Sequence, residues 1–124
     1  DLSAEYGDIL TDIEGTEVML TLDMSSWIVS IVFFRKDTNL IEVNMRIPDR
    51  PGSINKALEI VAAANINLIS VFSKIVIAYQ AMSLEIVADM KDSCVSFEDL
   101  PGTIEGYYKD LRGVYELEGI RRLG

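Results

Sequence analysis

The chain has 124 residues and 49% of them are hydrophobic, which is enough for one ordinary domain with a closed core. The 20 Asp and Glu residues outnumber the 11 Lys and Arg residues and give a net charge of −9, which repels nucleic-acid backbones and anionic membrane surfaces. Cys94 is the single cysteine, so an intramolecular disulfide is excluded, and the apolar runs are far shorter than the roughly 20 residues of a membrane helix, so we expect a cytoplasmic protein.

Residues 1–38 are predicted to form an N-terminal extension. Apolar and polar side chains alternate over residues 16–23, and residues 27–35 carry apolar side chains on both faces, which indicates two strands. We expect a β-hairpin that adds to a sheet or to an interface. The sequence leaves open whether this segment is a remnant of another domain and, because the chain starts at Asp1 and not at a methionine, whether a further stretch precedes it.

Residues 39–124 are predicted to form one α+β domain. A strand over 40–47 has an apolar face and a polar face, and a helical stripe then runs to Ala62 and ends near Asn65. The remaining expected elements are a strand from Ile66 to Ser73, a strand from Met82 to Met90, a helix capped by Thr103 and ended by Gly113, and a strand from Val114 to Leu123. Residues 74–81 contain no Gly, Pro or Asn, so the turn between the middle strands cannot be placed.

An internal echo supports this layout. The run from Asp49 to Asn55, with Pro51-Gly52, resembles the run from Asp99 to Glu105, with Pro101-Gly102. Two βαβ units in succession interleave as a ferredoxin-like βαββαβ sandwich, in which two helices cover one face of a four-stranded antiparallel sheet. A short echo also arises by chance, and the element order does not depend on it.

The Pro51-Gly52 turn is the most informative local feature. Pro51 sets φ near the helical value and lacks an amide that the first helical position would leave unpaired. The amides of Gly52, Ser53 and Ile54 are then expected to point out of a helix N-terminus, where a carboxylate is favoured. An ordinary strand-to-helix turn explains the same dipeptide.

Residues 40–123 resemble an ACT domain, a small regulatory module that binds amino acids and related metabolites. The resemblance is carried by Ile41-Glu42-Val43, by Asp49-Arg50-Pro51-Gly52-Ser53-Ile54, by Ala63-Ala64-Asn65-Ile66-Asn67-Leu68 and by Leu84-Glu85-Ile86-Val87. It covers about two thirds of the chain and rests on a short, degenerate motif. ACT domains usually pair side by side, and their effector commonly sits at that interface, near the first strand-to-helix loop. The resemblance therefore implies a homodimer.

The resemblance assigns ligand binding to six residues: Asp49, Arg50, Gly52, Ser53, Ile54 and Asn67. The helix-end amides suit a carboxylate and Asp49 suits an ammonium group, which together describe an amino acid. Each polar side chain also has a purely structural explanation. Asp49 favours a helix N-terminus, Ser53 caps a helix, and Asn67 satisfies backbone groups at a strand end.

Two departures from the family pattern leave the effector open. Serine-sensing members carry His and Asn in this loop, where the present chain has Ile47 and Asp49. Phenylalanine-sensing members carry Glu-Ser-Arg-Pro after the first helix, where residues 70–73 read Ser-Val-Phe-Ser. No particular effector is therefore expected.

Catalysis is not expected. The chain has no histidine and one cysteine, which removes the commonest general base and the usual zinc ligand sets, and no phosphate-binding Gly-rich loop is present. The acidic residues Asp8, Asp12 and Glu14 lack calcium-binding spacing and are predicted to be solvated surface. We expect no cofactor and no metal.

Two functions from different classes remain. The first is a non-catalytic regulatory domain that binds an amino acid or a related small metabolite. The second is an oligomerisation or regulatory-subunit module that binds a partner enzyme without an effector, through the apolar segments 27–34 and 75–79. These segments would equally serve to complete the protein's own core.

Overall fold

The computed structural model describes residues 16–23, 28–35 and 37–123, with side chains from Asp37 onward. The chain divides between Thr38 and Asn39 into two units. In the first unit, β1 (Thr16–Asp23) pairs antiparallel with β2 (Ile28–Arg35), from Thr16 opposite Arg35 to Asp23 opposite Ile28. Trp27, predicted as the start of the second strand, lies outside the described residues.

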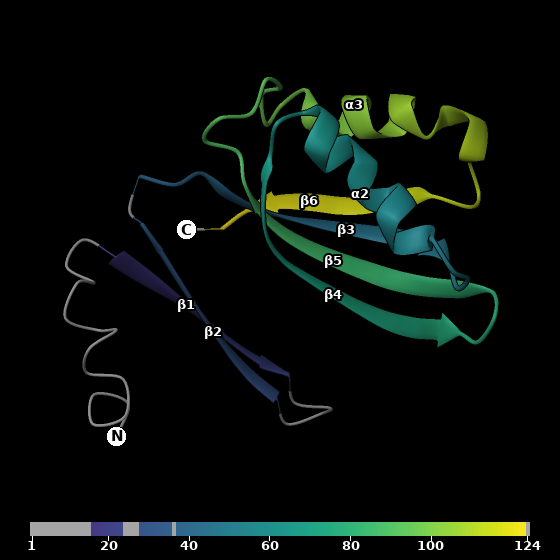
Figure 1. Cartoon of the computed structure of the whole chain (residues 1–124), viewed down its shortest axis with the longest axis horizontal. Helices are drawn as coiled ribbons and strands as arrows, with labels where there is room; N and C mark the ends of the chain where they lie inside the picture. Colours follow the sequence, from purple (N-terminus) through teal and green to yellow (C-terminus); the bar gives the residue numbers. More distant parts are fainter. Residues whose placement is uncertain (1–15, 24–27, 36, 124) are drawn as a thin grey trace. The chain divides into compact units, whose positions relative to one another are not determined.

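The second unit is an α+β domain. Its elements are β3 (Leu40–Pro48), α2 (Ser53–Ala63), β4 (Asn67–Ile77), β5 (Ala81–Asp89), α3 (Leu100–Tyr107), the 3-10 helix η1 (Lys109–Leu111) and β6 (Glu116–Arg122). The four strands form an antiparallel sheet in the order β4-β5-β3-β6. Figure 1 shows α2 and α3 on the same side of this sheet. The predicted α+β domain with a four-stranded antiparallel sheet and two helices is confirmed, and it is compatible with a ferredoxin-like fold.

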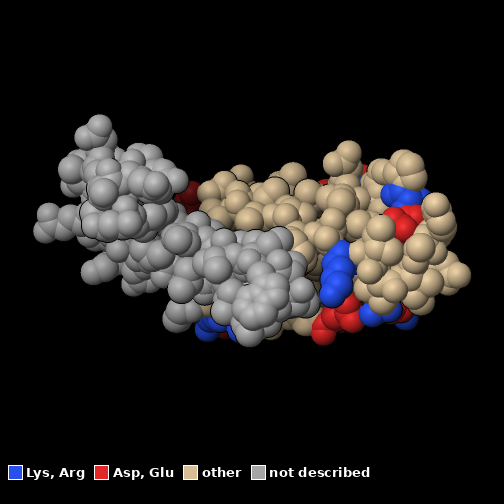
Figure 2. Space-filling view, turned by 90° about the horizontal axis from the view of Figure 1, so that it is seen from below, with Lys and Arg blue, Asp and Glu red and all other residues tan. Residues whose placement is uncertain are grey.

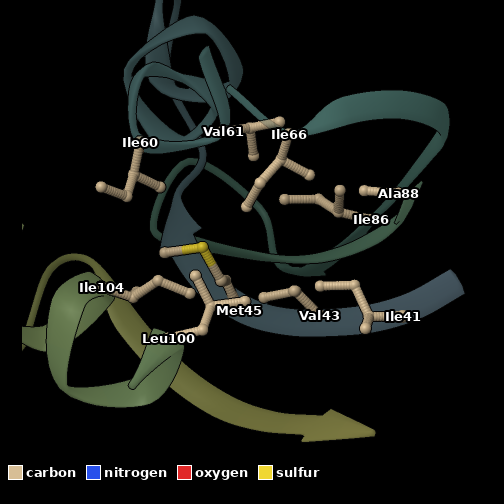
Figure 3. Close-up of a pocket in the computed structure, with 10 residues that line it drawn as sticks. All are labelled: Ile41, Val43, Met45, Ile60, Val61, Ile66, Ile86, Ala88, Leu100 and Ile104. Atoms are coloured by element: carbon tan, nitrogen blue, oxygen red, sulfur yellow. The ribbon is translucent and has the colours of Figure 1, made fainter. Parts of the chain in front are cut away.

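Strand alternation creates the core. The odd-numbered residues of β3 lie opposite the even-numbered residues of β5, from Ile41 with Ala88 to Ile47 with Met82, and all eight side chains are buried. Residues directly opposite in an antiparallel pair share a face, so this apolar face is the one that the helices cover. Side chains of α2 and α3, among them Ile60 and Ile104, complete the core (Figure 3).

The end of α2 follows the sequence prediction. Asn65 has φ of 55°, the left-handed conformation that Asn tolerates, and its amide donates to the carbonyl of Ala62. The Asn65 side chain also donates to the carbonyl of Asp92 at 2.9 Å. The predicted stop at Asn65 is therefore confirmed.

Three other boundaries were predicted wrongly. The helix expected to end at Gly113 ends at Tyr107, and the 3-10 helix η1 follows it. The strand expected to end at Ser73 continues to Ile77, and residues 78–80 form the turn, with Tyr79 at φ of 62°. The second helix begins at Leu100 and not after Thr103, whose hydroxyl donates to the Asp99 carbonyl at 2.9 Å from within the helix. The hydroxyl of Ser96 accepts from the Asp99 amide at 3.2 Å, which is the contact expected of a capping box.

Candidate functional site

The chain turns sharply between β3 and α2. Gly52 has φ of 86° and ψ of −9°, and the Ser53 amide donates to the Arg50 carbonyl at 3.3 Å. These are the features of a type II turn with Pro51 in its second position and Gly52 in its third. Pro51 is therefore not the first helical residue, as the sequence suggested, because the left-handed Gly52 stands between it and the helix.

A hollow of about 330 Å³ lies at this turn. Five of the six residues that the sequence assigned to a ligand site line it. The full lining is Asp49, Arg50, Pro51, Gly52, Ser53, Ile54, Asn55 and Met82. One wall is therefore the N-terminal end of α2, where the helix dipole favours negative charge, and another is an apolar side chain of β5.

Ser53 is the most unusual residue of the hollow. It is 1% exposed, and its hydroxyl has no hydrogen-bond partner among the described residues. Leaving a buried hydroxyl unpaired costs about 1 to 3 kcal/mol. Within the described part of the chain, the amides of Gly52 and Ile54 also have no acceptor, whereas the Ser53 amide is used by the turn. The Gly52 and Ile54 amides are thus left for another molecule, and the Ser53 hydroxyl lies buried beside them.

Asp49 is already engaged within the chain. Its carboxylate Oδ2 accepts from the Tyr79 amide at 2.7 Å, and its own amide donates to the Gln80 carbonyl at 3.2 Å. A carboxylate accepts up to about four hydrogen bonds, so capacity for an ammonium group remains. Sequence reasoning did not find Tyr79, because no turn-forming residue marks its position.

The remaining assigned residues differ in their surroundings. Arg50 is exposed and forms no ion pair with any residue that the structure describes. Ile54 is partly buried and packs against the core, so it supports the wall of the hollow. Both residues lie at the turn or at the start of α2, beside Ser53.

Asn67 does not join these residues within one chain. It pairs with Asp89, whereas the hollow lies where Ala81 pairs with Pro48. Ala81 and Asp89 are eight positions apart along β5, which corresponds to about 27 Å along a strand. Asn67 therefore sits at the opposite end of the sheet from Asp49.

A second void lies between the sheet and the helices. Its volume is about 10 Å³, and its ten lining side chains are all apolar, as Figure 3 shows. A void of this size without a polar wall does not hold an ordered water molecule. It is a packing defect of the core and not a binding site.

The sheet face away from the helices carries a charged cluster. Both guanidinium contacts of Arg121, at 3.2 and 3.0 Å, go to the carboxylate of Glu42, which also accepts from the Asn44 side chain. Hydrogen bonding to Arg121 lowers the pKa of Glu42, whereas burial, and then the charge of Glu42, raises the pKa of Glu85. Glu42, Asn44 and Arg121 hydrogen-bond to one another, so we assign no ligand to this cluster.

The described residues contain no group of three or more His, Cys, Asp or Glu side chains that could hold a metal ion. The acidic residues Asp8, Asp12 and Glu14 lie outside the described residues. Among the described helices, none is long and apolar enough to cross a membrane.

The fold and the hollow define a small α+β domain with a candidate ligand site at a strand-to-helix turn. No protein-family model matches the chain, and a search of curated proteins finds no match either. The resemblance to ACT domains therefore rests on the sequence motif and on the order of the elements.

Proposed function

We propose that residues 39–124 form a ferredoxin-like, ACT-like regulatory domain that binds an amino acid or a related small metabolite and catalyses no reaction, and that residues 1–38 add a β-hairpin. The observation that carries this proposal is the buried, unpaired hydroxyl of Ser53 in the wall of a hollow of about 330 Å³. Small-molecule pockets begin near this volume, at roughly 300 Å³.

The donors and acceptors of the hollow match an amino acid. The free amides of Gly52 and Ile54 suit a carboxylate at the positive end of α2, and the unpaired Ser53 hydroxyl lies buried beside them. The remaining lone pairs of Asp49 suit the ammonium group, and Met82 offers an apolar surface to a side chain.

A homodimer would complete the site. Strand β4 is an edge strand. If two copies of β4 pair antiparallel across a two-fold axis, the first residues of one copy lie beside the last residues of the other. The hollow lies near the C-terminal end of β4, because Met82 in its lining pairs with Ile75. Such pairing of two copies would bring Asn67 of the partner subunit toward that end. The separation of Asn67 from Asp49 within one chain is then expected.

Thermal unfolding in the presence of each common amino acid tests the proposal. A ligand at a hundredfold excess over its dissociation constant stabilises the folded state by about 2.7 kcal/mol, which corresponds to a rise in Tm of roughly 10 °C for a domain of this size. We expect one or a few amino acids to produce such a rise. A panel without any response would contradict the proposal.

A matched pair of variants locates the response. Ser53→Ala removes the unpaired hydroxyl and should reduce the ligand-induced rise in Tm. Ser96→Ala removes a hydroxyl four residues before the start of α3, where it already accepts from the Asp99 amide, and should leave the rise in Tm unchanged. Equal loss in both variants would place the ligand elsewhere.

The alternative is an assembly module without an effector, and the exposed edge strand favours it. Phe72 is 50% exposed and Ile75 is 57% exposed, with Leu68, Val76 and Ile77 also exposed. Figure 2, seen from the side on which β4 lies in Figure 1, shows that most of the described surface there is uncharged. Edge strands are usually protected by charge, and β4 carries only Lys74. A second copy or a partner enzyme would cover this edge, whereas light scattering that shows only monomer would contradict self-assembly.

A further inference from the structure

The loop before α2 and the turn between β4 and β5 are tied together by Asp49. Its carboxylate accepts from the Tyr79 amide at 2.7 Å and its amide donates to the Gln80 carbonyl at 3.2 Å, although 30 residues separate Asp49 from Tyr79. The first contact is short and charge-assisted, the stronger class of hydrogen bond. Within the turn, the Gln80 amide donates to the Ile77 carbonyl at 3.0 Å.

The turn stores backbone strain. Tyr79 has φ of 62°, in the left-handed region that a bulky residue avoids, and its side chain is 92% exposed. No packing of that side chain therefore holds the conformation. A strained residue persists only where its surroundings over-determine it. Here these surroundings are the two hydrogen bonds to Asp49, the Gln80–Ile77 hydrogen bond of the turn and the pairing of Ile77 with Ala81.

We infer that Asp49 is a positioning residue that makes the hollow's loop (residues 49–52) and the β4–β5 turn (residues 78–80) open and close as one unit. The loop lines the hollow, and the turn ends the exposed edge strand β4. An ammonium group bound to the remaining lone pairs of Asp49 would share its negative charge with the Tyr79 amide, weaken that hydrogen bond and loosen the turn. This regulatory meaning rests on the proposed function, whereas the coupling itself requires no effector.

Amide hydrogen exchange of the full chain, without any added ligand, tests the coupling. Asp49→Ala should accelerate exchange at Tyr79, at Gln80 and at residue 49 itself by roughly tenfold or more, because the two segments lose their common tie. Unchanged protection of the β3–β5 core amides, such as those of Met45 and Leu84, shows that the variant is folded. If exchange accelerates at Tyr79 alone, the contact is merely local and the inference fails.

Three further variants separate positioning from a general effect of charge. Asp49→Asn keeps an oxygen acceptor and should restore intermediate protection at Gln80. Asp110→Ala removes an exposed carboxylate on η1 that has no partner among the described residues, and should change none of these amides. Tyr79→Gly removes the strain. Asp49→Ala should therefore accelerate exchange at Gln80 less in the Tyr79→Gly background than in the parent chain. Equal acceleration in both backgrounds would contradict the inference.

If no amino acid raises Tm but Asp49→Ala accelerates exchange in both segments, the proposed effector is refuted and the coupling through Asp49 is supported. If an amino acid raises Tm but exchange accelerates at Tyr79 alone, the effector is supported and the coupling is refuted. The two ideas therefore fail on different measurements.

Discussion

The Tyr108 hydroxyl lies 2.8 Å from the carbonyl oxygen of Ala57, which joins the end of α3 to the middle of α2. The carbonyl of Lys56 lies at the same distance, and the Tyr108 ring stacks on Tyr115 with 5.5 Å between centroids. The two helices are therefore connected by a buried hydrogen bond as well as by apolar packing.

Tyr108→Phe should remove this hydrogen bond and leave the ring stacking intact. We expect a loss of about 1 to 2 kcal/mol in the free energy of unfolding, because the carbonyls of Ala57 and Lys56 lose the one hydroxyl proton that they share. Tyr107→Phe is the matched control, since the Tyr107 hydroxyl donates to Glu59 on the surface, and should change stability by less than about 0.5 kcal/mol. Urea denaturation measures both, and equal losses would show that the buried bond has no special role.

Ser53→Ala should stabilise the free protein. It removes a buried hydroxyl without a partner among the described residues, so we expect a gain of about 1 kcal/mol in the free energy of unfolding. Ser96→Ala should instead cost about 1 kcal/mol, since that hydroxyl accepts from the Asp99 amide. A destabilised Ser53→Ala variant, again by urea denaturation, would mean that the hydroxyl is satisfied in solution.

Two glycines should respond to alanine with opposite signs. Gly106 lies within α3 and has open space where a Cβ would go, so Gly106→Ala should stabilise by about 0.5 to 1 kcal/mol. Gly52 has φ of 86°, and Gly52→Ala should destabilise by about 1 kcal/mol or more even though the space is also open. Thermal unfolding of both variants checks the signs, and a neutral Gly52→Ala would show that the turn relaxes.

Glu85 and Glu42 should give opposite pH dependences. Burial raises the pKa of Glu85 above its ordinary value of 4.5, so its contribution to stability is present below that value and is lost as pH rises through the folded-state pKa. Arg121 lowers the pKa of Glu42, whose contribution is present above 4.5 and is lost as pH falls through its folded-state pKa. At about pH 7, Glu85→Gln should therefore be more stable than the parent chain and Glu42→Gln less stable. Chemical denaturation between about pH 7 and pH 4 measures the free energy of unfolding of each variant and of the parent chain. The differences between each variant and the parent chain should narrow as the solution becomes acidic.

If the proposed homodimer forms through β4, Ile75→Lys should abolish it. Ile75 is 57% exposed, so the lysine head can remain in water and the fold should persist. Val114→Lys is the control, because Val114 is also exposed but precedes β6 at the other side of the sheet. Sedimentation of the two variants should give a monomer for the first and the parental species for the second. If both remain dimeric, another surface holds the subunits together.

The sequence by itself determined the elements whose signals are local. Alternation from Ile41 to Ile47 predicted the buried face of β3, and the helical stripe with Asn65 at its end predicted α2, because each pattern depends on neighbouring residues alone. The antiparallel sheet with two helices followed from element order. The loop residues Asp49 to Ile54 were likewise found together, since they are consecutive.

Only the tertiary structure decided the features that depend on distant contacts. The left-handed Tyr79 is held by Asp49, 30 residues earlier, so no local residue could predict that turn. The prediction of Thr103 as the cap of α3 was wrong, because Asp99 is the N-cap and the helix begins at Leu100, before Pro101-Gly102. At Pro51-Gly52 the left-handed Gly52 instead precedes the helix. The strand register places Asn67 at the opposite end of the sheet from Asp49, and folding buries the Ser53 hydroxyl without a partner among the described residues. Neither property can be predicted from a short stretch of sequence, because both depend on contacts between distant residues.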